Sequence, residues 1–63
     1  MQANTETIIF NRKADARRVS RLLRAYNVLS RVQERELVIL VPPSGGAEKL
    51  RDLALRIHRN EKV

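Results

Sequence analysis

Residues 28–43 have the sequence VLSRVQERELVILVPP, and this stretch decides which fold the chain can adopt. Two apolar segments, residues 28–32 and 37–41, are separated by the charged stretch Gln33–Arg35. Two short apolar segments around a polar turn predict a β-hairpin, and the two prolines end it because proline has no N–H to donate to a sheet. The turn contains neither Asn-Gly nor Asp-Gly, so a loop followed by a single strand is the alternative.

A strand and a helix are predicted before this hairpin. Thr5–Asn11 is rich in β-branched and aromatic residues, which is typical of a strand covered on at least one face. Over about residues 13–26, apolar side chains recur every three or four positions and would gather on one side of a helix. They are Ala16, Val19, Leu22, Leu23 and Tyr26, followed by Leu29. Asn11 or Asp15 can cap the start of this helix, and Asn27 can adopt the left-handed conformation that ends it.

A second helix is predicted beyond the loop Ser44-Gly45-Gly46. Its apolar stripe consists of Ala47, Leu50, Leu53, Ala54 and Ile57. Asp52 and Arg56 are one helical turn apart and have opposite charges, a spacing that favours an ion pair on the helix surface. Leu55 lies outside the stripe, so it is expected either to be singly exposed or to belong to an interface.

The element order β-α-β-β-α predicts an α+β fold in one small domain, residues 1–63, with frayed ends at residues 1–4 and 60–63. A right-handed crossover would put both helices on one face of a three-stranded sheet, which gives a two-layer sandwich. This order resembles a ferredoxin-like domain that lacks its last strand. The stretch LLRAYNV at residues 22–28, followed by residues 37–42, is similar to small bacterial signal-transducing domains with related folds; no site residue is carried over from them.

Both faces of the predicted sheet are apolar. Alternation along the strands sets Leu37, Ile39 and Val41 against Val38 and Leu40, and it sets Ile8 and Phe10 against Thr7 and Ile9. Two helices cover one face only, so either the set Ile9, Val38 and Leu40 or its complement needs a partner. A shift of one residue exchanges the two sets, so the sequence does not decide between them. The first strand would also be an open edge, and we therefore expect a homodimer that pairs through the sheets.

Positive charge is concentrated in the first half of the chain. The net charge is +6, and residues 1–33 contain seven cations against two acids. Five of the cations lie on the first predicted helix and are the candidates for binding nucleic-acid phosphates: Lys13, Arg17, Arg18, Arg21 and Arg24. Guanidinium groups offer paired donors to phosphate, whereas the alternative is an ordinary solvated outer face. Phe10 and Tyr26 are the only aromatic residues and both fall in predicted apolar stripes, so base stacking is not expected.

Other chemistry has little support in the sequence. The chain has no cysteine and a single histidine, His58, which is expected at the surface, so neither a metal site nor a cofactor is predicted. Glu34 and Glu36 are spaced to share one side of a strand, but they lie at the predicted turn and are expected to be exposed. No nucleophile, base and orienting group occur together, so the chain is not expected to be an enzyme. The longest uncharged apolar run has five residues, far short of a membrane span, and we expect a cytoplasmic protein.

Two functions are compatible with these features. The first is a small basic regulatory or architectural module, dimeric, that contacts the phosphates of a nucleic acid, either DNA or RNA, through its basic helix. The alternative is a protein-interaction or oligomerisation module that uses an apolar sheet face or a free strand edge, with the positive charge attracting an acidic protein partner.

Overall fold

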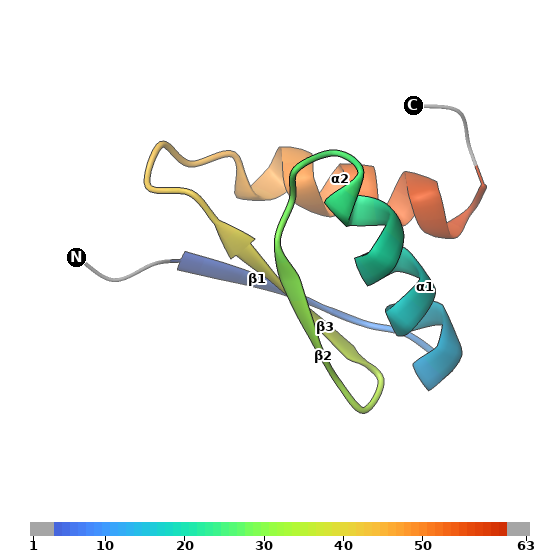
Figure 1. The fold of residues 1–63 in the computed structure, drawn as a ribbon. Helices are drawn as coiled ribbons and strands as arrows, with labels where there is room; N and C mark the ends of the chain where they lie inside the picture. The colour runs from blue at the N-terminus through green and yellow to red at the C-terminus, as the bar shows by residue number, and fades with distance from the viewer. Residues whose placement is uncertain (1–3, 61–63) are drawn as a thin grey trace.

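The protein has the predicted order of strands and helices in a computed structural model that describes residues 4–60 (Figure 1). The elements are β1 (Asn4–Ile9), α1 (Lys13–Arg24), β2 (Ser30–Gln33), β3 (Glu36–Val41) and α2 (Ala47–His58). The α+β class and the three-stranded sheet are therefore confirmed. Asn4 belongs to β1, and the rest of the expected N-terminal fraying, like that at residues 61–63, lies outside the described residues.

The sheet is antiparallel, with the strand order β1-β3-β2. β3 is the central strand: Ile8 of β1 lies opposite Leu37, and Val32 of β2 lies opposite the same residue from the other side. β1 and β2 are both edge strands. The expectation that β1 would be an edge is thus met, and the hairpin partner β2 forms the second edge.

The hairpin is confirmed, with a two-residue turn made of Glu34 and Arg35 between the paired residues Gln33 and Glu36. Glu34 has a φ of 55°, in the left-handed region that hairpin turns of this length require and that glycine or asparagine usually supplies. A glutamate occupies the position here, which is why the usual turn signal is missing from the sequence. The Phe10 N–H donates to the Arg35 carbonyl at 2.9 Å and ties the end of β1 to the turn.

Both helices lie on the same side of the sheet (Figure 1). α1 packs mainly against β2 and β3, and α2 packs against β1 and β3. The largest fully buried side chains come from α1 and from the central strand: Val19, Leu23, Leu37 and Ile39. The structure thereby decides the question of the two faces, because Leu37, Ile39 and Val41 point to the helices and Val38 and Leu40 point away.

The ends of the helices differ in part from the prediction. Neither Asn11 nor Asp15 caps α1: the residue at the cap is Arg12, and Asp15 instead accepts a hydrogen bond from Arg12 Nε at 3.3 Å. Asn27 does adopt the left-handed conformation, with a φ of 62°. The Val28 N–H then donates to the Leu23 carbonyl at 3.1 Å, the bond that closes a Schellman motif.

The buried side of α1 is narrower than the predicted apolar stripe. Ala16, Val19 and Leu23 are buried, whereas Leu22 and Tyr26 are exposed. Leu22 lies about 40° around the helix from Arg18, away from β2, and Tyr26 lies beyond the last residue of the helix. Leu55 of α2, expected outside the core, is half-buried and packs against it.

Candidate polyanion-binding surface

Two side-chain contacts define the orientation of α1. On one flank the hydroxyl oxygens of Ser20 and Ser30 are 2.6 Å apart, which joins α1 to β2. On the other flank Arg18 reaches the end of α2. Residues two positions apart on an α-helix are separated by about 160° around its axis, so these contacts mark opposite flanks of α1.

Four of the predicted phosphate-binding cations lie along the solvent side of the flank that faces β2. Measured around the helix from Ser20, they fall within about 100° of it in the direction away from the core. We call them the cationic surface: Lys13, Arg17, Arg21 and Arg24. All four are exposed. The structure therefore leaves accessible four of the five charges that the sequence predicted to share one face of the helix.

Among residues 4–60, no acidic side chain forms an ion pair with a cation of the cationic surface. The three ion pairs there involve other cations: Arg12 with Asp15 at 3.3 Å, Arg51 with Glu6 at 3.2 Å and Arg56 with Asp52 at 3.1 Å. The Asp52–Arg56 pair confirms the predicted one. Asp15, the acid of the first helix, lies about 140° around the helix from Ser20, on the side of α2. A negatively charged ligand at the cationic surface would therefore meet no nearby carboxylate from α1.

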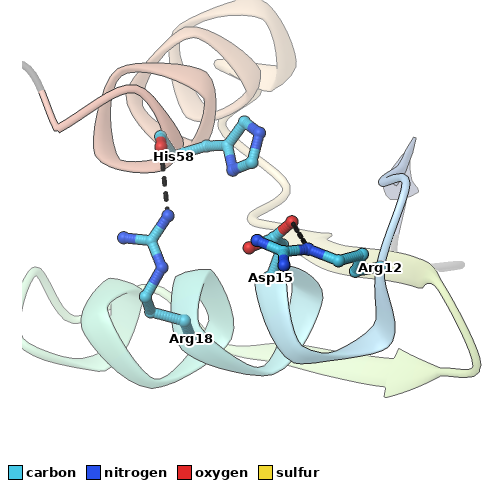
Figure 2. A network of polar contacts seen from close by, with 4 residues as sticks. All are labelled: Arg12, Asp15, Arg18 and His58. Carbon is cyan, nitrogen blue, oxygen red and sulfur yellow. Dashed lines mark hydrogen bonds and ion pairs between the residues drawn. The ribbon is translucent and has the colours of Figure 1, made fainter.

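Arg18 differs from the other four candidates. Its side chain is half-buried, and its guanidinium donates to the carbonyl oxygen of Ile57 at 3.4 Å. It also donates to the carbonyl oxygen of His58 at 3.0 Å, as Figure 2 shows. These carbonyls belong to the last turn of α2, where a positive charge is favoured by the helix dipole. Arg18 therefore connects the two helices. No signal in the sequence indicates this, because the partners are 39 and 40 residues away.

His58 is packed rather than solvent-exposed. Its ring lies edge-to-face against Phe10, with ring centroids 4.8 Å apart. Its Nδ1 is buried and, among residues 4–60, has no hydrogen-bond partner. Over the same residues no three His, Asp or Glu side chains are grouped closely enough to hold a metal ion. His58 was expected at the surface, and the packing against the end of β1 is a long-range contact that its position in the helix could not indicate.

The sheet face away from the helices carries the other predicted site. Ile9, Val38 and Leu40 all lie on it, with Ile9 68% and Leu40 36% exposed. Leu29, from the apolar segment 28–32 that the sequence predicted as a strand, joins them: it is 58% exposed, and its carbonyl accepts the Leu40 N–H at 2.9 Å. A surface pocket of about 300 Å³ lies at the turn end of the strands, lined by Ile9 and by residues 33–36.

Comparison with known proteins adds no further constraint. No protein-family model, curated protein or solved structure matches this chain significantly. Within residues 4–60, neither helix has the length and apolar character needed to cross a membrane.

Proposed function

We propose that this protein is a small basic module that binds nucleic acid by contacting phosphates through the cationic surface of α1. One observation carries the proposal. Lys13, Arg17, Arg21 and Arg24 are exposed on one side of the helix, and none of them forms an ion pair within residues 4–60. Four unpaired cations in such a small domain concentrate positive potential where a polyanion can reach it.

The dimensions of the surface suit a phosphate backbone. From Lys13 to Arg24 the helix rises by about 16 Å, which corresponds to the axial rise of roughly five base-pair steps of duplex DNA at 3.4 Å each. Arginine and lysine contacts to phosphate provide affinity without base readout. The expected binding is therefore largely independent of sequence and strongly dependent on salt.

The test is fluorescence anisotropy of labelled duplex DNA, single-stranded DNA and RNA, titrated with protein over a salt series. The variant Arg17→Gln/Arg21→Gln is compared with the matched variant Lys49→Gln/Arg56→Gln, which removes the same charge from α2. Loss of two phosphate contacts should reduce the slope of log K against log salt by about two, and the matched variant should leave it nearly unchanged. Equal losses in the two variants, or binding that vanishes at physiological salt, would contradict the proposal.

A second candidate function, homodimer formation, is favoured by the exposed apolar residues of the outer sheet face. The outer face carries Leu29 beside Leu40 at one end and Ile9 opposite Glu36 at the other, and it gains free energy when it is covered. The occupant we favour is a second copy, because Arg31 and Glu36 have opposite charges and alternate onto the same face. A two-fold axis can place Arg31 of each copy opposite Glu36 of the other copy. Such a dimer would present two cationic surfaces and add apolar burial to a domain whose own core is small.

A further inference from the structure

The two edges of the sheet differ in how their main-chain groups are used. In an antiparallel pair, alternate residues direct both their N–H and C=O to the neighbouring strand. Because the Leu40 N–H donates to the Leu29 carbonyl, the residues of β2 that face β3 are Arg31 and Gln33. Ser30 and Val32 therefore direct their main-chain groups away from the sheet.

The edge formed by β1 is partly closed by α2. The hydrogen bond from Phe10 to Arg35 sets the alternation of this strand, so Thr7 is one of the residues that face outward. Arg51 Nη1 donates to the Thr7 carbonyl at 3.2 Å and to Glu6 Oε1, also at 3.2 Å. Among residues 4–60, no such contact occupies the main-chain groups of Ser30 and Val32. β2 is therefore the more accessible edge.

Positive charge flanks the β2 edge on both faces of the sheet. On the helix side, Lys13, Arg17 and Arg24 lie on the flank of α1 that contacts β2 through Ser20. On the opposite face, the exposed Arg31 projects from β2 itself. A second copy of β2 paired at this edge would bring the same cations together, and their repulsion disfavours that arrangement. An acidic segment would be attracted from both faces.

We propose that the β2 edge binds an extended acidic segment of a partner protein, which adds to the sheet as a fourth, antiparallel strand. Its main chain would pair with Ser30 and Val32, whose side chains point towards α1. In an antiparallel pair, opposite residues project to the same face, so the segment residues bonded to β2 would carry the carboxylates that meet Arg17 and Arg24. This inference does not rest on nucleic-acid binding, since a phosphate backbone has no peptide N–H and C=O groups that could pair with a strand edge.

The experiment uses a nine-residue probe peptide of alternating Glu and Thr, blocked at both ends, titrated into ¹⁵N-labelled protein. Two modified probes have the same charge: one is N-methylated at the central Glu residues, the other at the central Thr residues. The first should bind at least about tenfold more weakly, because donors to the β2 edge are lost, and the second should bind like the parent. The amide signals of Ser30 and Val32 should shift with the parent peptide.

Protein variants test the charge. Arg17→Gln/Arg24→Gln should weaken the parent peptide several-fold, whereas Lys49→Gln/Arg56→Gln, on α2, should change its affinity little. Equal binding by both N-methylated probes would show attraction by charge alone and overturn the proposal, as would no binding at low salt. Nucleic-acid binding is scored separately by anisotropy, so a protein that binds nucleic acid but not the parent peptide overturns this inference and leaves the proposed function standing.

Discussion

The guanidinium of Arg18 donates a hydrogen bond to the main-chain carbonyl of His58 at 3.0 Å, which joins the middle of α1 to the last residue of α2. The two residues are 40 positions apart. Arg18 therefore has a structural role, whereas the other arginines of α1 are exposed. We expect substitutions of Arg18 and of these arginines to have different effects on stability.

Arg18→Gln removes the hydrogen bonds to the end of α2 and is expected to lower the free energy of unfolding by about 1 kcal/mol. A fully buried contact would contribute more, but the Arg18 side chain is only half-buried. Arg17 is exposed and has no partner within residues 4–60, so Arg17→Gln should change the free energy of unfolding by less than about 0.5 kcal/mol. Urea denaturation measures both values. Equal stabilities of the two variants would show that the Arg18 contacts contribute nothing in solution.

The hydroxyl pair of Ser20 and Ser30 should be energetically coupled. Replacing either serine with alanine leaves the other half-buried hydroxyl without this partner, whereas replacing both removes the unsatisfied group. We expect a coupling free energy of about 1 kcal/mol in a double-mutant cycle measured by chemical denaturation. Additive effects of the two substitutions would contradict the contact between α1 and β2, and with it the flank assigned to the cationic surface.

Glu34→Gly is expected to stabilise the protein by about 0.5–1 kcal/mol, because Glu34 has a φ of 55° and glycine adopts this conformation without steric cost. The matched variant Arg35→Gly changes the neighbouring turn residue, whose φ is not positive, and should lower stability. The midpoint of thermal unfolding reports both changes. A lower midpoint for Glu34→Gly would mean that the side chain of Glu34 has a role outside the turn.

Ile9→Ser should weaken self-association while changing the stability of the dilute monomer little, because the Ile9 side chain is 68% exposed on the outer sheet face. Sedimentation equilibrium over a range of protein concentrations measures the association. The control is Leu22→Ser, which removes an exposed leucine from α1 and should leave association intact. A wild-type protein that remains monomeric at hundreds of micromolar would exclude the dimer.

Much of the local structure was predictable because it depends on neighbouring residues. The hairpin follows from two apolar segments around Gln33–Arg35, and the ion pair of Asp52 and Arg56 follows from one-turn spacing. The left-handed Asn27 follows from its tolerance of that conformation. The predicted cap of α1, Asn11 or Asp15, was wrong. Several polar residues lie near the start of the helix, and which of them takes the cap position depends on where the chain enters the helix.

Other features depend on contacts between distant segments. Both faces of β3 carry apolar residues, so the sequence does not show which face the helices cover. The helices pack against Leu37 and Ile39, which leaves Val38 and Leu40 on the outer face. Periodicity also placed Leu22 in the core stripe, whereas in the structure it is exposed on the flank of α1 near Arg18. Leu29 has the spacing of the helical apolar stripe but belongs to the predicted strand segment 28–32, and its pairing with Leu40 puts it on the outer face.

The sequence by itself determined the β-α-β-β-α order, the amphipathic character of α1 and its excess of positive charge, because each depends on residue type and on spacing of a few residues. Only the tertiary structure decided which cations remain accessible, which sheet face is uncovered and which strand edge is open. The physical reason is that a helix flank or a sheet face acquires its environment from elements far away in the chain. Arg18 and Arg17 are neighbours in sequence, yet the position of α2 buries part of one and leaves the other in solvent.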